Sequence, residues 1–259
     1  MAAVTAWKIR AARLLLSLLP VSAFACGTIA AEATSSSPIP LEKGTRWVYE
    51  ARVRWTPVSG SGQTGVQSNR LEWTSEVVDC IRGKSTRAAV VHAFPMDILG
   101  MDPVKPTGYT VLVETGNKLY SAPAKTARQA SKLAKRFAAN PERLAGQNEL
   151  LLDLPLHADK RWGGDAETAA RTDGWYCWRV ETEKAQTLQV KGLPSADYHI
   201  IYTVAYRTNP DHQVLDIAPG VGLTHLEYEH HGAVFSEDVR LVELKRPILS
   251  PTTPPTPAR

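Results

Sequence analysis

The 259-residue chain has no long hydrophobic run after its first 25 residues, and it lacks the short motifs that mark common catalytic sites. A membrane-spanning helix needs about 20 consecutive apolar residues, so we expect none here. C-x-x-C, H-E-x-x-H and phosphate-loop patterns do not occur, and Ser195, Ser236 and Ser250 are outside the G-x-S-x-G context of a serine hydrolase. These absences predict a non-catalytic protein without a cofactor, although an active site assembled from distant residues would leave no local pattern.

A metal site is not expected either. His225, Glu227, Glu229 and His231 alternate and therefore share one face of a predicted strand. The outer two lie about 20 Å apart in an extended chain, too far to bind one ion. Only a neighbouring pair could share an ion, with further ligands from another strand.

The chain also lacks a large excess of charge. Of its 30 basic residues, Lys8, Arg10 and Arg13 lie in the first 25 residues, leaving 27 basic against 26 acidic residues and a net charge of +1. Nucleic-acid binding depends on many basic contacts to phosphates. The composition therefore predicts no nucleic-acid partner.

The amino terminus has the pattern of an export signal over residues 1–25. Three basic residues precede an apolar run from Leu14 to Ala25, and small residues lead to Cys26. Cleavage after Ala25 would release a free protein, whereas a lipid on Cys26 would anchor it to a membrane, with residues 26–39 as a flexible tether. In either case we expect an exported protein of the bacterial envelope, in the periplasm or anchored to a membrane.

Only three cysteines occur in the chain. If Cys26 is used at the cleavage site, Cys80 and Cys177 remain as a pair, and an oxidising compartment would allow them to form a disulfide. Two separate thiols are the alternative, because the sequence does not give the distance between them.

β-Strand patterns dominate residues 40–245, which we interpret as one domain. Trp47 to Trp55 alternates apolar with charged residues, so this segment is predicted to be a half-buried strand. The fold class we expect is mainly β, a curved antiparallel sheet that forms a half-barrel-like meander. Further strands are predicted over Leu71–Ile81, Ala88–Phe94, Tyr109–Glu114, Lys118–Ser121, Trp175–Thr182, Tyr198–Arg207, Val214–Ile217, Leu223–His231 and Val234–Leu244.

One amphipathic basic helix is predicted over residues 123–140, where small and apolar residues recur at helical spacing among lysines and arginines. We expect it to pack on the sheet with its charges in water, and docking on anionic lipid or acting as a lid are the alternatives. Residues 246–259 are rich in proline and threonine and are predicted to be disordered.

The two halves of the domain, residues 40–122 and 150–245, begin alike. Pro40 to Trp47 reads PLEKGTRW and Pro155 to Trp162 reads PLHADKRW, with P-L and R-W at the same offsets. This similarity suggests a two-fold internal repeat, although proline before a strand is common.

These segments, together with A-P-G-V-G-L at Ala218–Leu223, resemble uncharacterised bacterial exported proteins and lipoproteins. The resemblance covers most of residues 38–245 and implies a W-x-Y strand that opens the fold, with A-P-G-V-G-L before the last hairpin. It carries no known activity. By analogy of fold alone, it implies the curved half-barrel of periplasmic lipoprotein carriers.

An apolar concave face of such a sheet could hold a lipid or an apolar segment of another envelope protein. The residues expected there are Trp47, Tyr49, Trp55, Trp73 and Trp162, with Trp178 and Tyr202 as further members. Their alternative role is an ordinary core. The sequence therefore favours a non-catalytic envelope protein that binds an apolar ligand, with a protein–protein interaction module or an exported hydrolase as alternatives.

Overall fold

The structure is a computed structural model that describes residues 37–57, 65–98, 108–144, 149–164, 171–230 and 235–247. The chain divides into two units, 1–34 and 35–259, and all described residues belong to the second. The predicted signal peptide, Cys26, His231 and residues 248–259 lie outside the described residues.

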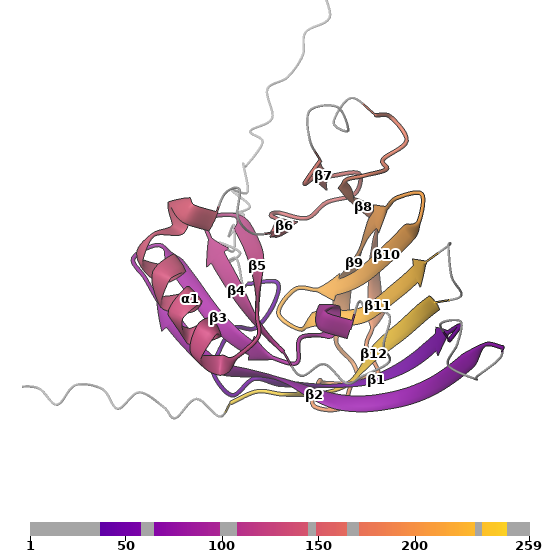
Figure 1. Ribbon diagram of the computed structural model, residues 1–259, viewed down its shortest axis with the longest axis horizontal. Helices are drawn as coiled ribbons and strands as arrows, with labels where there is room; N and C mark the ends of the chain where they lie inside the picture. Colours follow the sequence, from indigo (N-terminus) through magenta and orange to yellow (C-terminus); the bar gives the residue numbers. More distant parts are fainter. Residues whose placement is uncertain are drawn as a thin grey trace, which may run out of the picture. The chain divides into compact units, whose positions relative to one another are not determined.

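A single antiparallel sheet of 12 strands forms this unit, and it curves into a nearly closed barrel, which confirms the expected fold class (Figure 1). β1 (Arg46–Trp55) lies in the middle of the sheet. The chain runs outward from β1 to β6 at one edge, crosses to β7 at the other edge, and returns to β12, which pairs with β1. The remaining strands are β2 (Gln67–Arg82), β3 (Thr86–His92), β4 (Tyr109–Thr115), β5 (Lys118–Ala124), β6 (Glu149–Asp153), β7 (Arg161–Trp162), β8 (Trp178–Thr187), β9 (Tyr198–Arg207), β10 (Asp211–Ala218), β11 (Gly222–His230) and β12 (Phe235–Lys245).

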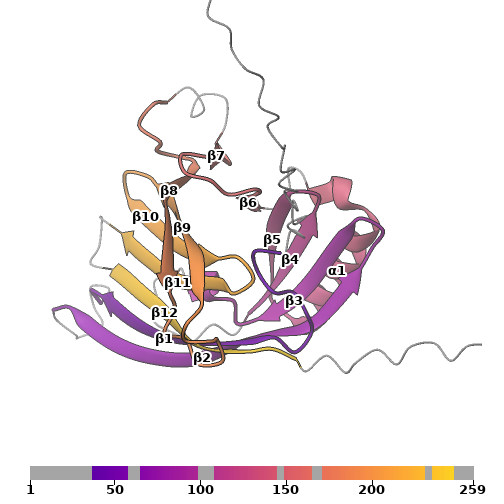
Figure 2. The same cartoon turned by 180° about the vertical axis from the view of Figure 1, so that it is seen from behind.

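The predicted helix is α1 (Ala127–Ala139), and it packs on the outer face of the first half of the sheet (Figures 1 and 2). The Thr126 hydroxyl accepts a hydrogen bond from the Gln129 backbone and so caps its amino end. Ala134 and Phe137 of α1 are buried in a small core with β3, β4 and β5. The predicted packing of the helix on the sheet is therefore confirmed. No helix of the described segments is long and apolar enough to cross a membrane.

The inner face of the sheet carries the main core. Trp47 and Tyr49 of β1 are 1% exposed, and both reach the loop and strand that follow β10. The Trp47 indole donates a hydrogen bond of 2.8 Å to the Val221 carbonyl, and the Tyr49 hydroxyl donates one of 2.9 Å to the Leu223 carbonyl. The alternation predicted for β1 therefore places its aromatic side on the core and its charged side outward.

The two similar segments before β1 and β7 form the same hydrogen-bonded turn. Gly44 N–H donates to the Val77 carbonyl at 2.8 Å, and Asp159 N–H donates to the Val180 carbonyl at 2.9 Å. Gly44 and Asp159 both have positive φ, 89° and 66°. Aspartate tolerates this left-handed conformation better than most residues with a side chain, which explains how it can replace glycine in the second turn.

β6 and β7 were not among the predicted strands, β2 and β10 begin earlier than predicted, and β8 begins later. β6 was not expected, because a short apolar run such as ELLLD does not distinguish a strand from a buried helical segment. β8 begins at Trp178 rather than at Trp175, because Tyr176 has a φ of 61°, which is incompatible with a strand.

Two 3₁₀ helices complete the described elements. η1 (Pro95–Ile98) follows β3 and η2 (Pro141–Leu144) follows α1. Phe94, just before η1, is 4% exposed and belongs to the main core, and Met96 of η1 packs against that core. The connection from β3 to β4 therefore helps to fill the inner side of the curved sheet.

Candidate functional site

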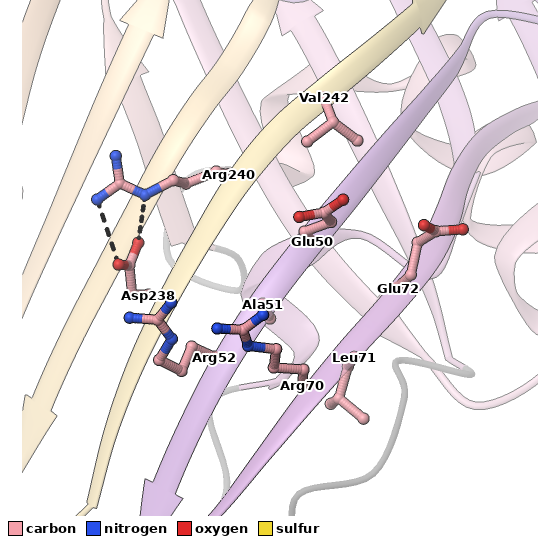
Figure 3. A pocket seen from close by; sticks show the side chains of 9 residues that line it. All are labelled: Glu50, Ala51, Arg52, Arg70, Leu71, Glu72, Asp238, Arg240 and Val242. Carbon is pink, nitrogen blue, oxygen red and sulfur yellow. Dashed lines mark hydrogen bonds and ion pairs between the residues drawn. The ribbon is translucent and has the colours of Figure 1, made fainter.

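A groove of about 400 Å³ crosses the outer face of β2, β1 and β12, opposite the main core (Figure 3). Charged residues make up six of its nine lining residues, two from each strand. Its lining residues are Glu50, Ala51, Arg52, Arg70, Leu71, Glu72, Asp238, Arg240 and Val242. We call this surface the charged groove.

Strand register places like charges side by side in the charged groove. Glu50 of β1 lies directly opposite Glu72 of β2, and Arg52 lies opposite Arg70. Like charges at directly opposite positions destabilise a sheet. In the described part of the chain, none of these four side chains makes an ion pair or a hydrogen bond.

The third strand could have neutralised these charges, because Arg240 lies opposite Glu50 and Asp238 opposite Arg52. Instead, Asp238 and Arg240 pair with each other. The Arg240 guanidinium donates hydrogen bonds of 3.0 and 3.2 Å to the two carboxylate oxygens of Asp238 (Figure 3). The carboxylate pair and the guanidinium pair beside them remain available for a ligand.

Asp238 is held from its other side by His225 of β11. His225 Nε2 lies 3.0 Å from Asp238 Oδ1, and its Nδ1 lies 3.4 Å from Asp216 Oδ2. The hydrogen bond with Asp216 is the main cause of a raised pKa at His225, which burial opposes and the bond with Asp238 reinforces. His225 thereby fixes Asp238 at the end of the groove.

The same network continues away from the groove across three strands. Thr203 of β9 donates a hydrogen bond of 2.7 Å to Asp216, and Thr182 of β8 donates one of 3.0 Å to Thr203. Neither hydroxyl bonds to His225, so the network contains no activated nucleophile of the Ser-His-Asp kind. No group of three metal-ligating side chains occurs among the described residues.

The aromatic residues expected on an apolar ligand face lie in the main core. Trp47, Tyr49, Trp73 and Trp162 are at most 6% exposed, and Trp55 is half-buried against the same cluster. Tyr49 and Trp73 stack with ring centroids 5.7 Å apart. Trp178 is likewise in this core, and Tyr202 packs against it. The structure therefore favours the alternative role of these side chains as core.

Cys80 and Cys177 are both free in the structure, which corresponds to the alternative of two separate thiols. Cys80 lies on β2 and Cys177 just before β8, and five strands separate β2 from β8 in the sheet order. The sequence could not reveal this separation. Cys26 lies outside the described residues, so its lipidation stays a prediction.

A buried carboxyl group was not anticipated. Glu237 of β12 is 1% exposed, and neither of its carboxylate oxygens has a hydrogen-bond partner. Burial raises its pKa to about 8. The alternation in β12 carries the signal for this position, because Glu237 lies between the inward residues Phe235 and Val239.

Two solved structures are similar to this chain. A candidate lipoprotein from Parabacteroides distasonis has a TM-score of 0.37 and 12% identity, and the match covers 81% of this chain and 99% of that one. A candidate exported protein with a YmcC-like fold from Bacteroides fragilis has a TM-score of 0.36 and 13% identity, with 82% and 100% covered. No protein-family model and no curated protein matches the chain.

Proposed function

We propose that the protein is a non-catalytic module of the bacterial cell envelope that binds an extended segment of a partner polypeptide in the charged groove. The export pattern of residues 1–25 supports the location. The main support for peptide binding is the arrangement of charges in the groove. The adjacent carboxylates of Glu50 and Glu72 lie beside the adjacent guanidiniums of Arg52 and Arg70, and none of the four has an ionic partner among the described residues. The packed aromatic core gives less support to an apolar ligand on that face.

Stability alone does not account for this arrangement. Exchanging Glu72 and Arg70 would place opposite charges across from each other at both positions, which stabilises antiparallel strands by roughly 0.2–1 kcal/mol per pair. A sheet selected only to fold would favour that exchange. A partner that brings opposite charges to both pairs compensates for the repulsion and explains why it persists.

An extended polypeptide matches the spacing of the groove. The acidic and basic pairs lie two residues apart along β1 and β2, about 6.6 Å at the rise of an extended strand. Side chains two residues apart on an extended partner lie on one face at the same spacing. A segment with a basic and an acidic residue separated by one residue would therefore neutralise both pairs at once.

Fluorescence anisotropy with labelled peptides tests this proposal. Four threonine-rich peptides differ only in a central Lys-Thr-Glu, Lys-Thr-Lys, Glu-Thr-Glu or Gln-Thr-Gln. We expect the Lys-Thr-Glu peptide to bind the full chain about tenfold more tightly than the neutral one, since each of its two charges faces two opposite charges, and four exposed ion pairs at roughly 0.35 kcal/mol each correspond to about that ratio. High salt should remove the preference.

A variant of the charged groove in which both pairs are acidic makes the test specific. In Arg52→Glu with Arg70→Glu, the preferred peptide should change to Lys-Thr-Lys. A control with the same change of net charge, Arg82→Glu at the end of β2 with Lys84→Glu in the turn that follows, should keep the original preference. Equal binding of all four peptides to the unchanged protein, or an unchanged preference in the acidic variant, would rule the proposal out.

A further inference from the structure

A second cavity, of about 220 Å³, lies on the inner face of the sheet, on the opposite side from the charged groove. It is bounded by β4, β5 and β6 from the first half, by β10 from the second half, and by the start of the connection after β3. Its lining residues are Phe94, Met96, Thr110, Ser121, Pro123, Glu149 and Gln213. Because β10 is far from β4 to β6 in the sheet order, the cavity exists only when the sheet is curved.

The cavity lies beside the seam where the two ends of the sheet approach each other. β6 is one edge strand and β8 is next to the other. Glu149, the first residue of β6, is exposed and lines the cavity, so a ligand can reach its carboxylate. Partial desolvation raises the pKa of Glu149, and the Trp178 indole of β8 opposes the effect. A cation that reached this carboxylate would stabilise its charged form.

Gln213 supplies a hydrogen-bond donor without a partner. Its side chain is 9% exposed and lines the cavity, and its Nε2 makes no hydrogen bond. An unpaired buried amide is costly, so an acceptor in the cavity would be stabilised there. Ser121 on β5 adds a hydroxyl that bonds to no described residue.

The remaining walls of the cavity are apolar. Phe94 is almost fully buried, Met96 packs against the main core, and Pro123 lies on β5 opposite Thr110. The volume equals that of about seven water molecules in the liquid, at about 30 Å³ each. A ligand is therefore limited to the size of one amino-acid derivative.

We propose that this cavity binds a small organic amine that also carries a carbonyl group on an apolar body, as an amino-acid amide does. The ammonium group pairs with Glu149, and the carbonyl oxygen accepts hydrogen bonds from Gln213 Nε2 and the Ser121 hydroxyl. The apolar body contacts Phe94, Met96 and Pro123. This site is independent of the peptide binding proposed for the charged groove.

Three aromatic probes separate the contributions of the ammonium group and the carbonyl group to binding. Phenylalaninamide has the ammonium and the carbonyl, benzylamine has only the ammonium, and phenylacetamide has only the carbonyl. Saturation-transfer NMR on the full chain measures each Kd. We expect phenylalaninamide to bind in the millimolar range, typical of a ligand of about 12 heavy atoms, and about tenfold more tightly than the other two.

Substitutions then assign each contact. Glu149→Gln should weaken phenylalaninamide and benzylamine by about tenfold, the loss of one charged hydrogen bond, and leave phenylacetamide unchanged. Gln213→Leu should weaken the two carbonyl compounds and leave benzylamine unchanged. Circular dichroism checks that each variant is folded, and Ser121→Ala replaces Gln213→Leu if the latter is not.

Glu229→Gln, an exposed carboxylate on the outer face of β11, serves as the matched control and should change no Kd. Absence of phenylalaninamide binding up to its solubility limit would overturn the proposal. The proposal would also be overturned if phenylalaninamide bound equally well to the unchanged protein, to Glu149→Gln and to Gln213→Leu or its replacement Ser121→Ala, because binding would then lie elsewhere.

Discussion

The buried carboxyl group of Glu237 predicts an unusual dependence of stability on pH. Its pKa is raised from 4.5 to about 8 by burial, and its side chain is 1% exposed. Between these two values the folded protein holds a proton that the unfolded chain has released. The free energy of unfolding therefore falls as pH rises through this range and levels off above the folded pKa.

The size of this effect follows from the two pKa values. Each pH unit between 4.5 and 8 removes about 1.4 kcal/mol, so that the full loss is about 5 kcal/mol, of the order of the whole stability of a domain. Glu237→Gln keeps the shape of the side chain but removes the titration. Its stability relative to the unchanged protein should rise with pH over the same range.

Urea unfolding of both proteins between pH 5 and pH 9 provides the measurement. The quantity to compare is the change with pH of the difference in unfolding free energy between the two proteins. The cost of burying an amide does not depend on pH and therefore cancels from this change. Glu229→Gln on β11 is the control and should show a difference below about 0.5 kcal/mol at every pH. A Glu237→Gln difference that stays constant from pH 5 to pH 9 would refute the assignment of Glu237 as a buried, unpaired carboxyl.

Two further predictions concern packing and cysteine chemistry. Gly83→Ala should destabilise the protein by about 1–3 kcal/mol, because its Cβ would lie 2.3 Å from the Ala138 carbonyl oxygen at the end of α1. The control Lys84→Ala, in the same turn, should change the stability little. Equal melting temperatures of the two variants would contradict this packing. Alkylation without reductant, followed by peptide mapping, should find Cys80 and Cys177 as separate modified thiols, with Cys80 reacting faster in the folded protein because it is more exposed. Recovery of a Cys80–Cys177 linked peptide would show that they form a disulfide after all.

Local patterns predicted the strands and the helix well, because alternation and helical spacing record which side of an element is buried. The segment Trp47–Trp55 is an example, since its alternation identified both the strand and its core side. The similarity of Pro40–Trp47 and Pro155–Trp162 suggested an internal repeat, and the structure adds that the two segments form turns with the same hydrogen bonds. In both cases the information lies within ten consecutive residues.

The candidate sites depend on register, which the sequence did not reveal. Glu50 faces Glu72 only because β2, a strand of 16 residues, pairs with β1 at one particular offset. A shift of one residue would turn all of its side chains to the other face. The hydrogen bonds from Asp216 through His225 to Asp238 similarly join three different strands. Such contacts follow from the order of strands in the finished sheet and leave no signal in any single segment.

The position of β1 beside β12 also bears on when this protein can finish folding. Arg46 pairs with Lys245 and Trp55 with Phe235, so the central contact of the sheet joins segments separated by up to about 200 residues along the chain. Contacts of such high sequence separation form slowly. A chain that emerges amino end first leaves one edge of β1 unpaired until its last strand appears, and its two halves stay unjoined. The sheet order thus delays completion of the fold until nearly the whole chain has been delivered.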